Sequence, residues 1–503
     1  MTVGNLAELV SRAAQADPAK AALLFGDGQL TWSQLDARVD AAAAGLLALG
    51  LTAGDRVGLH LGNVPEFAVC WFATLRAGLV AVPLNPGSTG PELTHVLGDS
   101  GARAIVTAAG TAPTVLALAD GPEHLVVVGP AQGRARSYDE VLARDPAPTA
   151  VEPVGGGEDL AAVLYTSGTS GRPRGAMLTH RALLASLEQG ARISPAVVGP
   201  DDVVLLVLPL FHVYGLNGAL GAVAFHGATG VLVERFDPVD TLAVVRRHSV
   251  TSLLGAPPMY VAWSTLPDAG DGFSSVRVAL SGAAPLPPEV LQRILDVTGH
   301  HVFEGYGLTE TAPTLTSTLM SEVAKPGSIG RPVPGVELQL RDESGRPVEE
   351  GDPGEIVVRC ANVFSGYWPD GSGGADADGW FATGDVAVWD DDGDLRLVDR
   401  RRELILVSGF NVYPREVEEV LARHPDVQEA AVLGVPHPYT GEAVKAFVVP
   451  RPGAGLTADA LIAYAGKSLA RFKCPSEVEL VEELPHSATG KVSKGRLREL
   501  SSG

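Results

Sequence analysis

Cysteine is scarce in this sequence, and nothing in its spacing pairs or clusters it. The three cysteines, Cys70, Cys360 and Cys474, lie far apart and form no CxxC pair. An odd, low count argues against a disulfide framework or a zinc site and is typical of a protein from a reducing cytosol. We therefore expect all three to be small, buried, apolar residues.

The sequence also lacks long apolar runs, and it has fewer positively than negatively charged residues. No run approaches the roughly 20 residues that a membrane-spanning helix needs, and Met1–Lys20 lacks the pattern of a signal peptide. Lys and Arg number 38 against 59 Asp and Glu, for a formal net charge of −21. Bulk electrostatics therefore attracts neither nucleic acid nor an anionic membrane, and any polyphosphate needs a local, shaped site. We expect a soluble, cytoplasmic protein with no integral membrane association.

The chain has 503 residues, too many for a single core, and its first half alternates between two patterns. Short β-branched runs typical of buried strands are each followed by a pattern typical of a helix. This alternation predicts an α/β fold with much parallel sheet, flanked by helices. The predicted strands are Arg56–Leu61, Leu79–Pro83, Ala104–Thr107, Leu160–Tyr165, Val203–Leu208, Gly230–Val233, Ser252–Leu254 and Val276–Leu280, and the predicted helices include Pro65–Ala77, Glu92–Asp99 and Thr179–Leu187.

The order of strand-like and helix-like segments changes near Asp399, where a second domain is predicted. Its strands are expected at Leu404–Val407, Glu429–Val435, Ala443–Val449 and Val478–Leu480, and its helices at Pro414–Arg423 and Ala458–Leu469. These elements suffice for a small α+β domain of about 100 residues. We place the boundary at Arg402, which gives an N-terminal domain of residues 1–401 and a C-terminal domain of residues 402–503.

A loop rich in glycine and hydroxyl residues follows the strand predicted at Leu160–Tyr165. Residues Thr166–Gly175 read Thr-Ser-Gly-Thr-Ser-Gly-Arg-Pro-Arg-Gly. Its glycines let backbone N–H groups turn toward a ligand, its hydroxyls add donors and its arginines add charge, which suits a polyphosphate. It is not a Walker loop, because GxxxxGK[ST] does not fit. Taken alone, the stretch could equally be a plain flexible loop.

Five further motifs follow in a fixed order. They are Gly305–Glu310 (GYGLTE), Gly379–Asp385 (GWFATGD), Asp399–Glu403 (DRRRE), Ser408–Pro414 (SGFNVYP) and Pro485–Lys491 (PHSATGK). With the loop, they resemble the adenylate-forming superfamily of acyl-CoA synthetases, peptide-synthetase adenylation domains and firefly-type luciferases, from about Leu30 to the end. The resemblance implies a large N-terminal domain, a mobile C-terminal lid, and the use of ATP, Mg²⁺ and coenzyme A.

The resemblance also implies a role for individual residues of an ATP site. The β- and γ-phosphates would be held by Thr166, Ser167, Gly168, Thr169, Ser170, Gly171 and Arg174. The family usually has Lys at the position of Arg174, and Arg keeps the charge while adding a bidentate fork. The α-phosphate would bind Thr309, and Mg²⁺ would bind Glu310 together with Thr166, since oxygen ligands suit this cation.

The nucleoside would lie against other segments. Adenine would pack on Tyr306, within a surround formed by Gly282, Ala283, Ala284, Glu304, Gly305 and Gly307. The ribose would bind Asp385 and Arg400. Taken singly, Tyr306 could be a core aromatic residue, Glu310 an acid in the first turn of a helix, and Asp385 part of a simple turn.

Enzymes of the superfamily that this chain resembles first join the acid to ATP as an acyl-adenylate and then transfer the acyl group to CoA. The resemblance implies that three residues act in these two steps in turn. Lys491 would lie against the carboxylate and the α-phosphate during adenylation. Arg402 matches the family's hinge, and Gly409 would let the pantetheine arm of CoA pass close to the backbone after the lid has swung. Outside this context Lys491 would be an exposed lysine in a terminal turn and Gly409 a strand-end turn.

The acid is indicated by two segments. Phe211–Leu216 borders the acyl tunnel in the family, where His212 would pack near the acyl phosphate, although a satisfied core histidine is an equal alternative. Malonyl-CoA synthetases carry an Arg directly before the Tyr, where this chain has Gly305. The stretch Glu304–Pro313 most resembles medium- and long-chain fatty acyl-CoA synthetases. A neutral, elongated acid therefore leads, ahead of an aryl acid and of a malonyl-type substrate.

Other functions stay open at this point. The acceptor could be a carrier-protein thiol instead of CoA, although the insertion usual in fatty acyl-AMP ligases is not seen between Tyr367 and Asp399. A luciferase-like oxygenase would need a dedicated luciferin pocket, which nothing here suggests. A non-catalytic binding protein would not need to keep Glu310, Asp385, Arg400 and Lys491. A homodimer is left open, as is the chain length of the acid.

Overall fold

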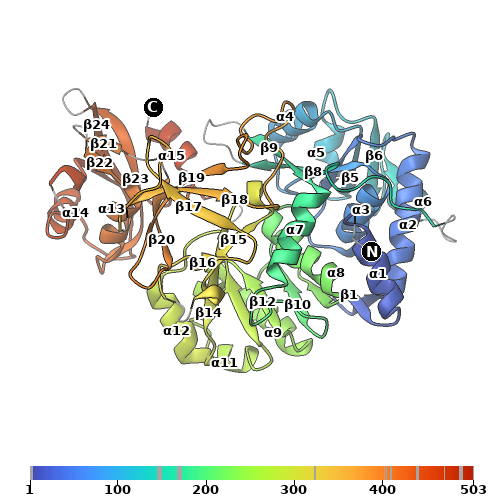
Figure 1. Cartoon of the computed structure of the whole chain (residues 1–503), viewed down its shortest axis with the longest axis horizontal. Helices are drawn as coiled ribbons and strands as arrows, with labels where there is room; N and C mark the ends of the chain where they lie inside the picture. The colour runs from blue at the N-terminus through green and yellow to red at the C-terminus, as the bar shows by residue number, and fades with distance from the viewer. Residues whose placement is uncertain are drawn as a thin grey trace. The chain divides into compact units, whose positions relative to one another are not determined.

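The computed structural model describes residues 4–143, 150–166, 173–321, 325–349, 351–400, 403, 405–407, 410–437, 441–469, 471–486 and 491–501. The chain forms two compact units (Figure 1). The larger comprises Met1–Pro326, Gly330–Glu337 and Arg359–Phe381, and the smaller comprises Gly327–Ile329, Leu338–Val358 and Ala382–Gly503. The predicted α/β class is confirmed. The boundary at Arg402 stays a prediction, since this residue lies outside the described ones.

A seven-stranded sheet belongs to the larger unit, in the order β7-β6-β5-β3-β4-β8-β9. Its neighbours run parallel except for the antiparallel pair β8 and β9. Parallel strands are covered on both faces, so their sequences read as continuous apolar runs. The strands are β3 (Arg56–His60), β4 (Val80–Pro83), β5 (Ala104–Ala108), β6 (His124–Val128), β7 (Arg136–Ser137), β8 (Leu160–Thr166) and β9 (Arg174–Thr179).

A nine-stranded sheet is the second layer of the larger unit, in the order β16-β15-β14-β13-β12-β10-β11-β1-β2. Its centre, from β14 to β1, is parallel, and its two edges are antiparallel. The strands are β1 (Ala21–Phe25), β2 (Gly28–Thr31), β10 (Val203–Leu206), β11 (Thr229–Leu232), β12 (Ser252–Gly255), β13 (Val278–Ser281), β14 (Val302–Gly307), β15 (Thr314–Ser317) and β16 (Arg331–Pro332).

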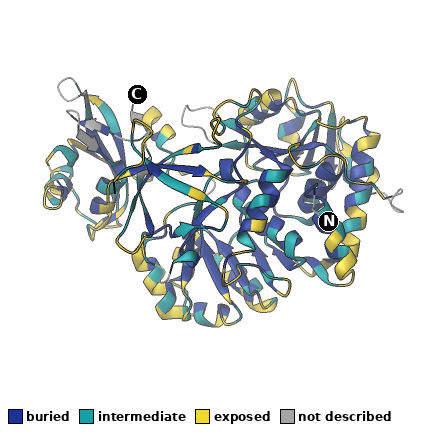
Figure 2. Ribbon diagram, viewed as in Figure 1, coloured by how far each residue is buried: buried dark blue, intermediate teal, exposed yellow. Residues whose placement is uncertain are grey.

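Helices connect many of the parallel strands; α3 is buried all round from Phe67 to Arg76, whereas α12 buries one face. In α12 the buried residues are Val290 and Ile294, four positions apart, while most of its other positions are exposed (Figure 2). Local signals set the helix ends: Thr89 and Glu92 form a capping box at the start of α4, and Gly101 ends it at φ +59°. The helices are α1 (Glu8–Ala16), α2 (Trp32–Ala48), α3 (Pro65–Arg76), α4 (Gly90–Ser100), α5 (Ala112–Leu116), α6 (Tyr138–Val141), α7 (His180–Gly190), α8 (Ala222–His226), α9 (Pro238–Arg247), α10 (Pro257–Trp263), α11 (Ala269–Gly272) and α12 (Pro288–Thr298).

The predicted elements of the larger unit are present, with changed bounds, but several of its strands were not predicted: β1, β2, β6, β7, β9, β14, β15 and β16. Strand β13 begins at Val278, two residues later than predicted. Strand β10 ends at Leu206, two residues earlier than predicted. Strand β9 was not predicted, because its sequence Arg-Gly-Ala-Met-Leu-Thr has little β propensity and is held by pairing with β8. The glycine-rich segment therefore connects two antiparallel strands, and its two ends, Thr166 and Arg174–Gly175, lie within those strands.

The smaller unit contains two sheets. A four-stranded sheet consists of β17 (Glu337–Arg341), β18 (Gly354–Arg359), β19 (Phe381–Trp389) and β20 (Leu395–Arg400). The other contains β21 (Ile405–Val407), β22 (Phe410–Val412), β23 (Val427–His437), β24 (Gly441–Pro450) and β25 (Glu477–Leu480), with helices α13 (Pro414–Ala422), α14 (Ala458–Ala465) and α15 (Lys494–Ser501). Val417, Val432, Val444 and Leu461 are core residues of this sheet and its helices.

The described helices include none that is long and apolar enough to cross a membrane. The three cysteines are free thiols, but only Cys70 is fully buried, whereas Cys360 and Cys474 are half-buried. The expectation that all three are buried is therefore wrong for two of them. Burial raises the pKa of the Cys360 thiol to about 12, with partial offsets from the backbone at Asn362 and from Arg181.

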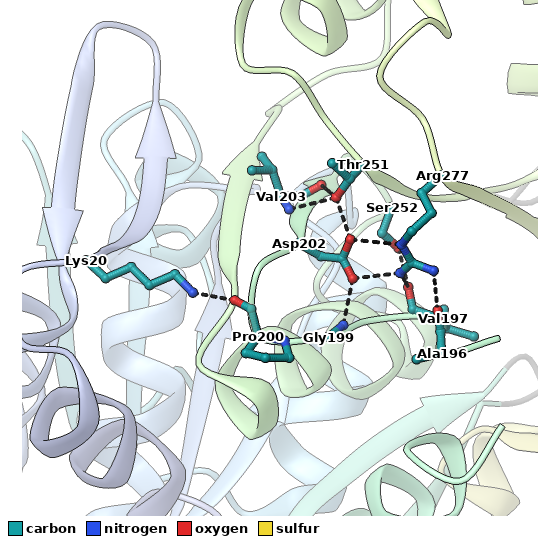
Figure 3. A network of polar contacts seen from close by, with 10 residues as sticks. All are labelled: Lys20, Ala196, Val197, Gly199, Pro200, Asp202, Val203, Thr251, Ser252 and Arg277. Atoms are coloured by element: carbon teal, nitrogen blue, oxygen red, sulfur yellow. Dashed lines mark hydrogen bonds and ion pairs between the residues drawn. The ribbon is translucent and has the colours of Figure 1, made fainter. Parts of the chain in front are cut away.

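A buried carboxylate joins the amino ends of three neighbouring parallel strands (Figure 3). Asp202 precedes β10 and accepts hydrogen bonds from Thr251 Oγ1, before β12, at 2.6 Å and from Arg277 Nη2, before β13, at 2.7 Å. The Gly199 N–H donates to it at 2.7 Å. Burial alone would raise the pKa of Asp202, but the bonds from Arg277, Thr251 and Gly199 outweigh it and lower the pKa. These hydrogen bonds thereby hold the amino ends of β10, β12 and β13 together.

The N-terminal segment is attached to the rest of the larger unit by two buried polar side chains. Asn5 donates through Nδ2 to the carbonyls of Leu75 and Val154, at 2.9 and 3.0 Å. His180, the first residue of α7 and 1% exposed, accepts the Leu6 N–H at Nδ1, at 3.0 Å. A histidine that accepts at Nδ1 carries its proton on Nε2, so His180 is neutral in the folded chain.

The neutral state of His180 predicts a loss of stability in mild acid. Burial, slightly offset by the charge of Asp159, lowers its pKa from 6.5 to about 4. The unfolded chain therefore takes up this proton first as the pH falls, so the contribution is complete above pH 6.5 and is lost between pH 6.5 and 4. We expect this one group to lower the free energy of unfolding by about 3 kcal/mol across that window.

Urea unfolding at a series of pH values measures this effect. His180→Gln keeps a neutral acceptor, so its free energy of unfolding should fall less steeply than that of the wild type over this window. Parallel curves for the two proteins would show that His180 is not the group responsible.

Candidate active site

The carboxyl ends of parallel strands gather several of the residues singled out from the sequence. Strands β10, β12, β13 and β14 run parallel, and Ser281 at the end of β13 is paired with Glu304 on β14. His212 and Gly282–Ala284 lie in the segments that follow β10 and β13, and Gly305–Gly307 form the carboxyl end of β14 itself. In open α/β sheets, ligands bind outside the carboxyl ends of the strands. The fold thus places these three segments on the edge opposite to the Asp202 network.

Tight packing fixes the segment after β13. A Cβ added to Gly282 would lie 2.8 Å from the ring of Tyr214, so the ring and the backbone are in close contact. Ala283 has φ +70°, which is unusual for a residue with a side chain. The buried Glu304 accepts the Leu286 N–H at Oε1, at 2.9 Å. This bond ties the end of the segment to β14.

Strand β14 offers space at one glycine and none at another. A Cβ added to Gly305 would have one atom within 4 Å, the Thr316 carbonyl oxygen at 3.7 Å. A Cβ added to Gly307 would lie 1.6 Å from the carbonyl oxygen of Pro313. Tyr306 is half-buried between them and is paired with Thr316 on β15. Gly305 therefore leaves room beside Tyr306, while Gly307 allows the chain to turn back at Pro313.

Glu310 lies in a turn held from several sides. Thr309–Thr311 is a 3₁₀ turn (η2), and Glu310 is 9% exposed. Asn217 donates through Nδ2 to the Ala312 carbonyl at 2.8 Å. Asn362 donates to the carbonyls of Thr311 and Thr314. The Phe364 N–H donates to the Glu310 carbonyl at 2.9 Å. Side-chain and backbone donors from two other parts of the chain thus bind the backbone carbonyls of this segment and fix the position of Glu310.

Arg174 of β9 and Glu310 are linked through a third residue, Tyr367. Thr166 and Arg174 are paired across β8 and β9, and the loop residues Ser167, Gly168, Thr169, Ser170 and Gly171 lie outside the described residues. The Arg174 guanidinium stands 3.6 Å from the centre of the Tyr367 ring. The Tyr367 hydroxyl donates to Glu310 Oε1 at 2.7 Å. Arg174 and Glu310 therefore contact one aromatic side chain from two sides.

His212 precedes an uncommon helical segment. Residues Tyr214–Gly221 form a π-helix (η1), a geometry often found at functional sites. His212 is half-buried beside Phe211, with the two ring centres 4.6 Å apart. Asn217, whose amide holds the Glu310 turn, belongs to this π-helix. The His212 segment and the Glu310 turn are thereby linked through the helix backbone and one side chain.

The backbone register of the smaller unit pairs two further predicted residues. Asp385, 7% exposed, and Arg400 are directly opposite across the antiparallel pair β19 and β20. Gly384, at φ +79°, donates its N–H to Glu355 Oε1 at 3.2 Å. Cross-strand pairing thus brings the carboxylate residue and the arginine of the expected ribose site into register.

Lys491 is exposed and lies next to a well-anchored segment of the smaller unit. His486 and Val492 form a β-bridge on either side of it, and the Ser493 N–H donates to the Pro485 carbonyl. Lys494 pairs with Glu403 at 2.8 Å and with Glu418 at 2.9 Å. Burial would lower the pKa of Lys494, but Glu418 and Glu403 outweigh it and raise the pKa. Arg402 and Gly409 lie outside the described residues.

The described residues fit magnesium only as part of a nucleotide complex. No group of three or more His, Cys, Asp or Glu side chains gathers in the described part of the chain. Magnesium bound with a nucleotide usually takes one or two carboxylates and completes its shell with phosphate oxygens and water. A single oriented carboxylate such as that of Glu310 fits that requirement.

Three residues of the larger unit that hydrogen-bond to Glu310 or to the turn around it were not predicted from the sequence. They are Tyr367, Asn217 and Asn362, and each lies far along the chain from a group that it holds. The Gly-Tyr-Trp stretch at Gly366–Trp368 was the available signal for Tyr367. No local pattern marks the two asparagines, since their partners are backbone carbonyls.

Comparison with known proteins agrees with this geometry. Residues 10–368 match the family model of the AMP-binding enzyme, and residues 416–491 match that of the AMP-binding enzyme C-terminal domain. The chain is 37% identical to a long-chain-fatty-acid–CoA ligase of Yersinia pestis, covering 93% of this chain and 90% of the relative. It is 39% identical to a feruloyl-CoA synthase of Amycolatopsis sp, covering 97% of each. ATP-bound MatB from Rhodopseudomonas palustris is similar in structure, with TM-score 0.88 and 34% identity over 99% of both chains.

The contact between Gly307 and Pro313 predicts that a single methyl group displaces the Glu310 turn. Gly307→Ala should lower the free energy of unfolding by about 1–3 kcal/mol, because the backbone must open to admit the Cβ. ATP binding should weaken with it. Thermal melting and ATP titration measure the two effects.

Gly305→Ala is the matched control for stability, since it adds the same methyl group to the same strand where there is room. A Gly307→Ala protein as stable as this control, with unchanged ATP binding, would contradict the assignment.

Proposed function

The chain belongs to the family of AMP-binding enzymes, and we propose that it is an ATP-dependent carboxylic acid:CoA ligase that acts on a neutral, apolar acid. The observation that carries the proposal is the Glu310 turn, joined through Tyr367 to Arg174 at the end of the glycine-rich segment. A buried, oriented carboxylate beside a phosphate-binding arginine suits magnesium-bound ATP. The names of the two curated relatives, both acid–CoA ligases, support it.

The first half-reaction forms an acyl-adenylate. A carboxylate oxygen of the acid attacks the α-phosphorus of ATP, and the bond to the departing pyrophosphate breaks. Negative charge concentrates on phosphate oxygens in the transition state, so placed cations and donors supply most of the catalysis. Arg174 and the glycine-rich segment would hold the β- and γ-phosphates, and Thr309 the α-phosphate. Glu310 and Thr166 would hold Mg²⁺, which neutralises phosphate charge when bound.

The nucleoside would bind at the carboxyl ends of β13 and β14. Adenine would pack on Tyr306, within the surround of Gly282, Ala283, Ala284, Glu304, Gly305 and Gly307. Close packing at Gly282 and the Glu304–Leu286 bond support this placement, because they fix the walls of that segment. The ribose hydroxyls would bind Asp385 and Arg400, which the β19–β20 pairing sets opposite each other.

The second half-reaction transfers the acyl group to CoA. The CoA thiolate attacks the acyl carbon, the carbon–oxygen bond to AMP breaks, and AMP leaves. We assign Lys491 to the first step, where its ammonium would balance charge on the carboxylate and the α-phosphate, and Gly409 to the second. Arg402 would be the hinge between the two arrangements, with residues 1–401 and 402–503 as the two domains.

The open space at Gly305 supports a neutral acid. A side chain there would enter unfilled space beside Tyr306, and glycine supplies no charge for a second carboxylate. His212, on the segment leading into the π-helix, would lie near the acyl phosphate. A medium- or long-chain fatty acid leads, and an aryl acid is second because a feruloyl-CoA synthase is a relative at 39% identity. We place the enzyme in the cytoplasm, since its cysteines are free thiols.

A panel of acids tests the function as a whole. The purified protein is given ATP, Mg²⁺ and each of hexanoate, dodecanoate, palmitate, benzoate, ferulate and malonate, with and without CoA, and AMP and acyl-CoA are measured. We expect acyl-CoA with the apolar acids, and fastest with a fatty acid. AMP released only when a carrier protein is added would refute the CoA acceptor, and a preference for malonate would refute the neutral acid.

Lys491→Ala separates the two half-reactions. We expect pyrophosphate release to fall by at least about 100-fold, because a charged contact to the reacting groups is lost. Thioester formation from supplied acyl-adenylate and CoA should be retained.

The matched control is Lys467→Ala, which removes another exposed lysine of the smaller unit and should leave both steps unchanged. Full adenylation by Lys491→Ala would remove the assignment.

A further inference from the structure

Tyr367 contacts two groups that come from distant parts of the chain. Its hydroxyl donates to Glu310 Oε1 at 2.7 Å, 57 positions away in sequence. Its ring lies 3.6 Å from the guanidinium carbon of Arg174. An arginine over an aromatic face is attracted by the electrons of the ring, and a hydrogen bond to a carboxylate is stronger than one between neutral groups. Both contacts therefore involve a charge.

The position of Tyr367 is itself well determined. Its backbone forms a bridge with Ala176 of β9, and the flanking Gly366 carbonyl and Trp368 N–H bond to Met177 and Gly175 on the same strand. The Phe364 ring packs edge-on against the tyrosine ring, with centres 5.0 Å apart. The residue is thus fixed against β9, the strand that contains Arg174.

A second partner of Arg174, Ser372, lies on the same segment as Tyr367. Arg174 Nη2 donates to Ser372 Oγ at 3.4 Å, and Tyr367 and Ser372 form a β-bridge. A planar guanidinium can stack on the ring and still reach the serine, whereas the ammonium of a lysine is a point charge. These contacts are specific to the arginine that this chain carries in place of the usual lysine.

We propose that Tyr367 is a positioning residue that sets Glu310 and Arg174 as one unit, with its hydroxyl orienting the carboxylate and its ring orienting the guanidinium. The proposal rests on the proposed function, in which Glu310 holds the magnesium of ATP and Arg174 holds a phosphate. Tyr367 itself contacts neither the acid nor the reacting atoms in this role. It acts through the two charged side chains.

Substitutions at Tyr367 separate the two contacts. Tyr367→Phe removes only the hydroxyl, so the Mg²⁺ concentration for half-maximal ATP binding should rise about tenfold, with little change in ATP affinity at saturating Mg²⁺. Tyr367→Leu also removes the aromatic face, so ATP affinity at saturating Mg²⁺ should fall as well, by about three- to tenfold. Titrations of ATP binding at fixed Mg²⁺ concentrations, followed by calorimetry, measure both quantities without turnover.

Arg174→Lys tests the other side of the ring. It keeps the charge but loses the stacked fork, so it should weaken ATP binding at saturating Mg²⁺ and leave the Mg²⁺ midpoint unchanged. Tyr165→Phe is the matched control, because Tyr165 donates to the Asp99 carboxylate at 2.5 Å on the neighbouring strand β8. It removes the same kind of bond without touching Glu310, and both ATP titrations should match the wild type.

The outcomes distinguish this inference from the function it rests on. A Tyr367→Phe protein with the wild-type Mg²⁺ midpoint would overturn the positioning role, and so would equal shifts in Tyr367→Phe and Tyr165→Phe. Suppose that the wild-type chain binds ATP in a Mg²⁺-dependent way but ligates no acid. That result would refute the proposed function alone, because the titrations would still test the positioning role of Tyr367. Melting temperatures of all four variants, compared with the wild type, identify any that misfold, and Tyr367→Phe is expected to melt normally.

Discussion

The parallel pairing of β10, β12, β13 and β14 is the constraint on which the site in the larger unit depends. Parallel strands leave all their carboxyl ends at one edge, so segments far apart in sequence must leave the sheet together. The opposite edge is closed by Asp202, which ties the amino ends of three of these strands with short hydrogen bonds. The amino ends of these strands are thus held by structural hydrogen bonds, and the segments at their carboxyl ends contain the candidate site residues.

At the carboxyl ends of these strands, a close backbone approach and hydrogen bonds from distant residues together hold the Glu310 turn. Gly307 lets the chain turn where a Cβ would meet a carbonyl oxygen, and this turn carries Glu310. Asn217, Asn362 and Tyr367 then hold the turn from other parts of the chain. A carboxylate fixed in this way keeps its orientation before any ligand arrives, which lowers the reorganisation needed when charge develops on phosphate.

The sequence predicted much of this arrangement from pattern alone. Apolar runs separated by helical stretches predicted the α/β class and most of the parallel strands of the larger unit, because buried parallel strands need continuous apolar residues. The parallel strands β1, β6, β7 and β14 were not predicted. The motifs at Glu310, Asp385 and Lys491 predicted the candidate site residues. Strand β9 was missed, since its residues favour no strand by themselves, and two of the three cysteines proved only half-buried, since exposure depends on neighbours that no local pattern specifies.

What the sequence determined by itself was therefore the local chemistry: the types of many elements, the glycine and hydroxyl content of the segment after β8, and the identities of the charged residues in the motifs. What only the tertiary structure decided was which of these touch. Glu310 contacts the hydroxyl of Tyr367 and Arg174 contacts its ring, although these residues lie 57 and 193 positions from Tyr367 in the sequence. Strand pairing brings the three side chains together. A contact of that kind is set by the packing of the whole unit, whereas composition and spacing report only on neighbours along the chain.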